Sequence, residues 1–151
     1  MGISGRRVAT DWRVVVDNVD LSEWGFHVTI NDEKDQVDAS GFGGKRTFLQ
    51  GVRTQSVDVE FRAGDGTNEP YFKLRDLYES GSQFPFYVQP VNDGGTVSDT
   101  NWQYGGSLTQ VFQLPREANL NDVEDMSVTF APASNEGFSY GTAGTPAFGT
   151  V

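Results

Sequence analysis

The chain has 151 residues, and 21 acidic against 11 basic side chains leave it with a formal net charge of −10. A surface this acidic is poorly suited to holding duplex DNA through its phosphates or to binding an anionic membrane. The sequence contains no cysteine, which excludes disulfide scaffolds, thiolate metal sites and cysteine nucleophiles. No apolar run approaches the roughly 18 residues of a membrane-spanning helix.

Aromatic residues make up 13% of the chain, and 18 glycines and 6 prolines are spread along it. The aromatic content is too high for wholesale disorder, and the turn-forming residues favour many short elements over a few long helices. The first twelve residues include arginines but no apolar stretch, so we expect no signal peptide. Composition therefore predicts a soluble, acidic and β-rich protein.

The first half of the chain predicts short strands separated by polar segments. β-branched residues favour a strand at 12–19, and Val28 and Ile30 alternate with polar neighbours to predict another at 26–30. The stretch 31–35 is too polar for a core, so we expect the strand to stop there and to resume at 36–39. A glycine-rich loop follows at 41–47 and is too long for a tight hairpin turn.

The longest predicted strand covers residues 48–62. Val57, Val59 and Phe61 would share its apolar face, because successive side chains of a strand point to opposite sides. The side chains that alternate with them are polar: Thr54, Ser56, Asp58, Glu60 and Arg62. This strand should therefore have one face on the core and one wet face.

One helix is predicted, at residues 70–80. Pro70 suits its first turn, where the missing N–H costs nothing, and Gly81 supplies a stop at its end. Further strands are expected at 84–90, 103–114 and 126–130, and the two prolines in the first of these favour an edge strand or strand ends. Six to eight antiparallel strands with one inserted helix predict a mainly-β sandwich or barrel.

The chain divides into an N-terminal segment 1–11, a β domain 12–134 and a C-terminal arm 135–151. The C-terminal arm is rich in Gly, Ser, Thr and Ala and shows no period, so we expect it to be extended or flexible. Phe138, Tyr140 and Phe148 are unusual residues for a solvated tail. We expect them to anchor the arm on a neighbouring subunit, where each ring buries apolar area.

Side chains that could carry catalysis do not form a known pattern. The single histidine, His27, stands on the polar side of a strand without a nucleophile motif beside it. The segment 105–109 lacks the final glycine of a nucleophile elbow, and 39–47 lacks the first glycine and the Ser or Thr of a phosphate-binding loop. The carboxylates between 32 and 38 lack the glycine and final glutamate of an EF-hand loop. We expect no enzyme, no cofactor and no metal site.

Several short motifs follow one another along the chain. They are VDLS at 19–22, DASGFGG at 38–44, FLQG at 48–51, SVDVEF at 56–61 and SVTF at 127–130. Their order resembles that of the major tail tube proteins of long-tailed bacteriophages. The resemblance spans about residues 12–132, and the predicted helix and the strand at 84–90 fall in the family order too.

This resemblance implies a β-sandwich or barrel shared with the inner tubes of contractile tails and of type VI secretion. It also implies six subunits in a ring, and rings stacked into a tube through which the genome leaves. The protein would belong to the virion tail after assembly in the host cytoplasm. Its partners would be itself, a tape-measure protein and tail-end proteins, while DNA would pass a negative lumen without specific binding.

Two candidate surfaces follow from the resemblance. The polar residues 54, 56, 58, 60 and 62 would line the lumen, and an exposed outer face is the alternative for them. The candidate ring–ring contact is the loop Gly41, Phe42, Gly43, Gly44, Lys45, Arg46 and Thr47. Its two adjacent cations could meet the acidic C-terminal part of a neighbour, and a solvated loop is the alternative.

Two other function classes stay open at this point. One is a different tail component, a tail terminator or a head–tail connector. The other is a carbohydrate-binding β-sandwich, in which Trp24, Trp102 and Tyr104 would form a platform for stacking sugars.

Overall fold

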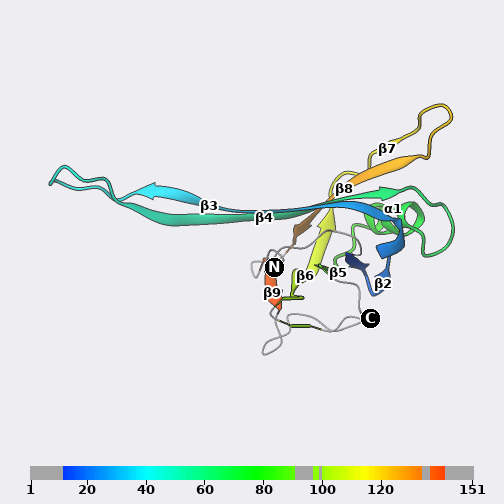
Figure 1. Ribbon diagram of the computed structural model, residues 1–151, viewed down its shortest axis with the longest axis horizontal. Coiled ribbons are helices and arrows are strands. Elements are labelled where there is room, and N and C mark those ends of the chain that lie inside the picture. Colours follow the sequence, from blue (N-terminus) through cyan, green and yellow to red (C-terminus); the bar gives the residue numbers. More distant parts are fainter. Residues whose placement is uncertain (1–11, 91–96, 99, 134–136, 142–151) are drawn as a thin grey trace, which may run out of the picture.

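The computed structural model describes residues 12–90, 97, 98, 100–133 and 137–141. The described elements are β1 (Arg13–Val16), β2 (Val19–Asp20), the 3-10 helix η1 (Ser22–Trp24), β3 (Gly25–Asp38), β4 (Phe48–Arg62), α1 (Pro70–Ser80), β5 (Phe84–Gln89), β6 (Gln103–Val111), β7 (Arg116–Glu117), β8 (Asp125–Pro132) and β9 (Ser139–Gly141). No helix among these residues is long and apolar enough to cross a membrane. The predicted mainly-β fold with one inserted helix is confirmed (Figure 1).

The strands form one antiparallel sheet in the order β2-β1-β5-β6-β8-β4-β3, with β7 on β8 and β9 on β6. Phe86 of β5 stacks on Phe130 of β8 with 4.1 Å between ring centroids, although β6 lies between these two strands in the sheet order. The sheet therefore bends over a shared core. Leu74 and Leu77 of α1 are buried against the same core.

Local signals set the bounds of α1. Glu69 before it is extended, Pro70 opens the first turn, and the helix ends at Ser80. Gly81 then takes a left-handed conformation with φ 68°, which glycine adopts without the steric penalty of a Cβ. Its N–H donates to the carbonyl oxygens of Leu77 and Tyr78, so the helix end is satisfied. The predicted helix at 70–80 is confirmed.

β3 and β4 form a long hairpin that leaves the body of the molecule (Figure 1). β4 also pairs with β8, but only from Val57 to Arg62. Residues 31–56, which we call the arm, run from the pair Asn31–Ser56 outward, and here the described strands pair with each other alone.

The arm corrects the expectation that the strand predicted at 26–30 stops at 31–35, because β3 continues without a break to Asp38. Backbone pairing with β4 holds this stretch, and both of its faces meet solvent over most of its length. A strand with both faces in solvent needs no apolar side chains, so the polar residues 31–35 do not interrupt β3.

Of the two alternatives for the prolines at 84–90, strand ends are confirmed, because Pro85 is the second residue of β5 and Pro90 follows its last residue. The other alternative was wrong, since β5 lies between β1 and β6 and is not an edge strand. Pro85 is accommodated at a register shift between Phe84 and Phe86 in the pairing with β6. A bulge of this kind tolerates a residue that cannot donate to the ladder. On its other side the carbonyl of Pro85 accepts a hydrogen bond from the N–H of Asp17.

Candidate functional site

The first candidate surface is the solvent side of the sheet formed by β3, β4 and β8. The predicted alternation along β4 is confirmed, because Val57, Val59 and Phe61 are 0% exposed. Residues directly opposite each other on paired strands share a face. The register therefore assigns to one surface, called the polar sheet face below, His27, Thr29, Asn31 and Glu33 of β3, Thr54, Ser56, Asp58, Glu60 and Arg62 of β4, and Asp125, Ser127 and Thr129 of β8.

Asp58 connects the three strands of the polar sheet face. Its carboxylate accepts a hydrogen bond of 2.9 Å from Nδ2 of Asn31 and one of 2.6 Å from Oγ1 of Thr129. Charged hydrogen bonds of this length are stronger than neutral ones. Asp58 is thus a structural acceptor as well as a negative charge on this surface.

The charges of the polar sheet face are mostly negative. Arg62 pairs with Asp125 at 2.6 Å and lies over the ring of Phe26, while His27 lies 3.6 Å from Glu60. Four carboxylates share the face with one guanidinium, a net charge of −3 with histidine neutral. Such a surface repels phosphates.

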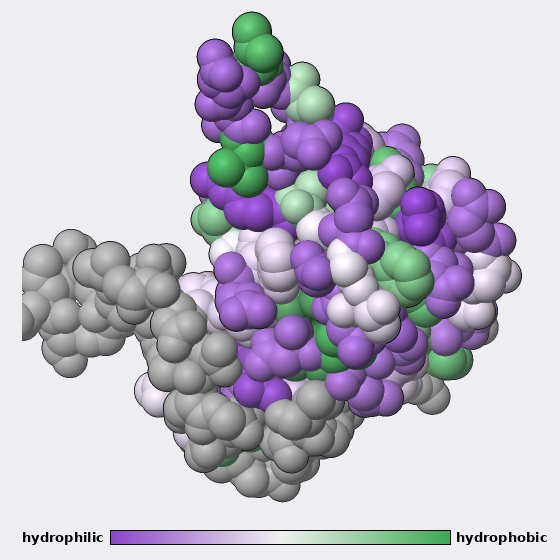
Figure 2. All heavy atoms as spheres, turned by 90° about the vertical axis from the view of Figure 1, so that its right-hand side faces the viewer, coloured by the Kyte–Doolittle hydropathy of each residue, from purple (hydrophilic) through white to green (hydrophobic). Residues whose placement is uncertain are grey.

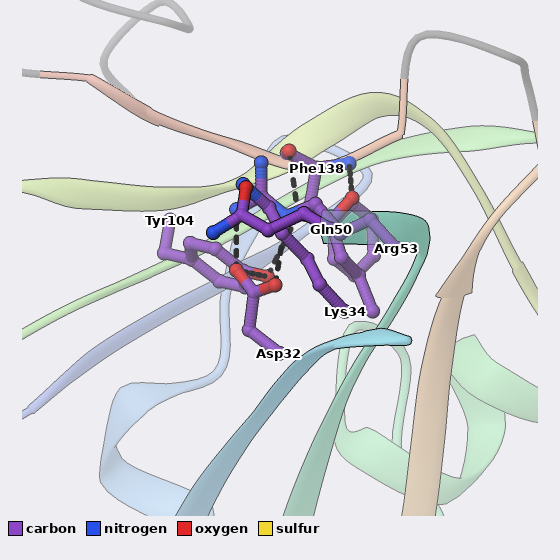
Figure 3. Close-up of polar contacts among 7 residues, drawn as sticks. Asp32, Lys34, Gln50, Arg53, Tyr104 and Phe138 are labelled. Carbon is purple, nitrogen blue, oxygen red and sulfur yellow. Dashed lines mark hydrogen bonds and ion pairs between the residues drawn. The ribbon is translucent and has the colours of Figure 1, made fainter. Parts of the chain in front are cut away.

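The second candidate feature is the base of the arm, where its inner side meets the body (Figure 3). Nε of Arg53 donates to Asp32 at 2.7 Å, and its Nη2 bonds the other carboxylate oxygen. The hydroxyl of Tyr104, on β6, donates to Asp32 at 3.1 Å. The hydrogen bond from Arg53 holds the pKa of Asp32 below its usual value, and burial raises the pKa of Tyr104.

Gln55 completes this network by binding the backbone of Phe138. Its Nε2 donates to the Phe138 carbonyl at 2.8 Å and to the Tyr104 hydroxyl at 3.1 Å, and its Oε1 accepts the Phe138 N–H at 2.9 Å. The side-chain amide thus pairs with a peptide group as a neighbouring strand would. The arm is thereby joined to the C-terminal segment 137–141.

Part of the predicted C-terminal arm lies on its own subunit. Phe138 is 2% exposed and belongs to the core, and β9 pairs with β6. The ring of Tyr140 packs 4.6 Å from that of Tyr104. Phe138 therefore anchors residues 137–141 within the subunit, which corrects the expectation that it docks on a neighbour. Tyr140 keeps about half of its surface exposed, so its docking on a neighbour stays a prediction, and Phe148 lies outside the described residues.

The tip of the arm is the loop 41–47, between the last residues of β3 and the first of β4. The Ala39 N–H donates to the carbonyl of Thr47, and the Thr47 N–H donates to Oγ of Ser40. Gly43 and Gly44 have φ values of 129° and 80°, a region that side chains with a Cβ rarely adopt. The loop that was predicted as a ring contact is thus held at the far end of the arm (Figure 1).

The arm exposes apolar and basic side chains near its tip. Lys45 and Arg46 are exposed, and no ion pair holds either of them among the described residues. The exposed large apolar residues of the arm are Val37, Phe42, Phe48, Leu49 and Val52. Side chains that remain exposed add little to the stability of the folded subunit, and a two-stranded hairpin without a partner is only marginally stable in water. Folding of the subunit therefore does not explain why these exposed residues are apolar.

A second projection joins β7 to β8 on the side of the body away from the arm (Figure 1). In Figure 2 it forms a mainly hydrophilic finger with apolar atoms at its tip. Leu120 is 93% exposed there, within a segment that carries Glu117, Asp122 and Glu124. Arg116 at its base pairs with Glu124 at 3.0 Å and with Asp65 at 2.7 Å.

The residues considered for other functions do not converge. Trp102 packs against Tyr140, and Tyr104 is fully buried, whereas Trp24 lies beside Gly64, so no sugar-stacking platform forms from the three. Within the described ranges no group of three or more His, Asp or Glu side chains could hold a metal ion.

No protein-family model matches the sequence, and no curated protein matches it. A chain from the tail of the empty GTA particle, refined with C6 symmetry, is similar with a TM-score of 0.58 at 19% identity, over 78% of this chain and 81% of that chain. A chain of the sheath/tube terminator of the PVC extracellular contractile injection system gives 0.67 at 12% identity, over 89% and 96%. A chain of the SPP1 tail tube gives 0.62 at 12%, over 80% and 72%. The described residues thus have the mainly-β fold of tail tube and tube-terminator proteins.

Proposed function

We propose that this protein is a structural subunit of a phage-type tail tube, and that it is not an enzyme. Six copies form a ring, and the rings stack into a conduit for genome delivery in the virion tail. The similarity to chains of a C6-symmetric tail and of a tail tube, over 78% and 80% of this chain, carries the proposal. The arm supports it, because it exposes apolar groups that the described residues leave uncovered, and such groups commonly mark a contact with another molecule.

The polar sheet face is proposed to line the channel. It lies opposite the core, its hydroxyl, amide and carboxylate groups are bound to one another across three strands, and its net charge is −3 per copy. A ring of six such faces repels DNA phosphates, so the genome slides without adhering. The C-terminal half of the lining strand, from Asp58 to Arg62, belongs to the body, while Thr54 lies on the arm.

The arm is proposed to make the contact between rings. Its tip carries the exposed cations Lys45 and Arg46, and the opposite side of the body carries the acidic β7–β8 projection (Figures 1 and 2). Complementary charges at opposite ends of one molecule favour head-to-tail contacts and fix their register. A tape-measure protein inside the tube and proteins that close its ends complete the proposed set of partners.

The direct test is electron microscopy of the purified protein over a range of concentrations. The proposal expects rings with six-fold symmetry and tubes built from them. Protein that stays monomeric at all concentrations contradicts it. The similarity to a tube terminator supports one competing role, and a terminator would form single rings that do not elongate.

The channel lining has its own test in assembled particles. Glu33→Lys with Glu60→Lys reverses two charges on the polar sheet face, whereas Glu23→Lys with Asp76→Lys makes the same charge change outside it, on η1 and α1. The first pair should leave the tubes intact and slow DNA release, because lysines in the lumen bind phosphates. Equal DNA release from both sets of particles would place the polar sheet face away from the channel.

A further inference from the structure

Two of the apolar features that the described residues leave uncovered have matching shapes and charges. The first is the tip of the arm, where Phe42 is fully exposed and Phe48 and Leu49 are about half exposed. The second is a groove of about 430 Å³ between the end of α1 and the end of β6. Exposed apolar patches on a soluble protein commonly mark a contact with another molecule.

The groove has an apolar floor and partly apolar walls. Leu77 of α1 and Val111 of β6 are buried at its base, and Tyr78 and Phe112 expose about half of their surface around it. Gln110 donates from Nε2 to the carbonyl of Gly81, which fixes the groove's edge to the end of the helix. The groove is therefore built from ordered elements and suits an aromatic side chain.

The charge at the groove is negative. The C-terminal end of a helix carries a partial negative charge, and cations are favoured there. α1 has no basic residue in its last turn, and Glu79 lines the groove instead, so no cationic side chain of that turn offsets the charge. The exposed cations Lys45 and Arg46 lie only a few residues from Phe42, so the arm tip has the complementary charge.

The two features lie on different sides of the molecule. The arm points away from the body, and α1 lies on the side opposite to it (Figure 1). A projection on one side and a matching recess on the other cannot meet within one subunit, and such an arrangement generates a head-to-tail contact that repeats from copy to copy.

We propose that the arm tip of one copy docks into this groove of a second copy, with Phe42 over the apolar floor and Lys45 and Arg46 beside Glu79 and the end of α1. This inference rests on the proposed tube function and names the receptor for its ring–ring contact. The alternative is a purely electrostatic contact between the arm tip and the acidic β7–β8 projection. The experiments below distinguish docking in the groove from that contact.

Cross-linking tests the docking directly, because the chain has no cysteine of its own. Phe42→Cys with Ser82→Cys places one thiol at the tip and one at the groove. Oxidised tubes of this variant should give a ladder of disulfide-linked copies on a non-reducing gel. The matched control, Phe42→Cys with Leu120→Cys, should give none; a ladder in the control, or none from tubes of the first variant, overturns the inference.

A second measurement does not depend on disulfide geometry. Burying a phenylalanine contributes about 1.5–3 kcal/mol, so Phe42→Ala should raise the critical concentration for tube assembly by at least about tenfold. Leu120→Ala, an equally exposed apolar truncation, should change it by less than about twofold. If wild-type protein forms tubes and the two variants behave alike, the docking is wrong and the tube function stands. If wild-type protein forms no tubes, both are wrong.

Discussion

Replacing Gln55 by alanine should release the base of the arm from the C-terminal segment. The side chain makes three hydrogen bonds, two to the backbone of Phe138 and one to the hydroxyl of Tyr104. Its loss leaves the N–H and C=O of Phe138 without this partner, whereas Tyr104 keeps its bond to Asp32. An unsatisfied polar group costs about 1–3 kcal/mol when buried. The site is only partly buried, so water offsets some of that cost.

We therefore expect Gln55→Ala to lower the free energy of unfolding by about 2 kcal/mol, which corresponds to a fall of roughly 4–8 °C in Tm for a chain of this size. Gln50→Ala is the matched control. It removes the same side chain from the same strand, but there the amide only accepts an exposed hydrogen bond of 2.9 Å from Lys34. Its expected cost is at most about 0.5 kcal/mol.

Denaturant unfolding followed by tryptophan fluorescence measures both variants, and hydrogen exchange locates the effect. In Gln55→Ala the amides of 138–141 should exchange faster than in wild type, because the side chain that accepts the Phe138 N–H is gone. Equal stabilities for the two variants, with unchanged exchange at these amides, would refute the idea that Gln55 fastens the C-terminal segment to the arm.

Two further predictions concern charge. Lys45→Glu with Arg46→Glu should leave the fold intact, as measured by circular dichroism, and prevent rings from stacking. Tubes of wild-type length from this variant would show that Lys45 and Arg46 do not contribute to the contact between rings. Because Arg53 holds the pKa of Asp32 below its unfolded value, the ion pair should stabilise the fold above about pH 5 and lose that contribution as the pH falls through the lowered pKa. The stability difference between wild type and Asp32→Asn should accordingly be larger at pH 7 than in acid and shrink as the pH falls below about 4, and a difference that does not change with pH would contradict this origin.

The parts of the fold that local signals determine were predictable. The helix α1 follows from a proline at its start and a glycine after its end, and the bounds 70–80 agree with the structure. The strand at 48–62 and its two faces follow from alternation, because one face of its body half is buried. In both cases the residues that set the structure are neighbours in the chain.

The arm could not be predicted from periodicity. Alternation in a sequence reports a contrast between a buried face and a wet face, and the arm has little such contrast. Its polar stretch 31–35 therefore looked like a loop, although β4 pairs with it almost throughout. The contact expected at the loop 41–47 rested on the adjacent cations Lys45 and Arg46 and on the family resemblance, and the exposed apolar residues of the arm were not used for it.

The network at the base of the arm was missed for a different reason. Gln55 lies 49 residues from Tyr104 and 83 residues from Phe138 in the sequence. No local motif around Gln55 predicts a contact with either of them. Composition pointed to the aromatics of the C-terminal segment as anchors on a neighbour, and it did not reveal that Phe138 fills a place in the core of its own subunit. Only the fold brings these residues together.

The central claim is that copies of this chain form a tube whose channel is lined by the polar sheet face. Cryo-electron microscopy of the assembled protein, at a resolution that separates strands, tests it most directly. We expect stacked six-fold rings in which Asp58 and Glu60 point into the channel and Val57 points away from it. Monomers at every concentration, or a tube whose channel is lined by another surface, would contradict it.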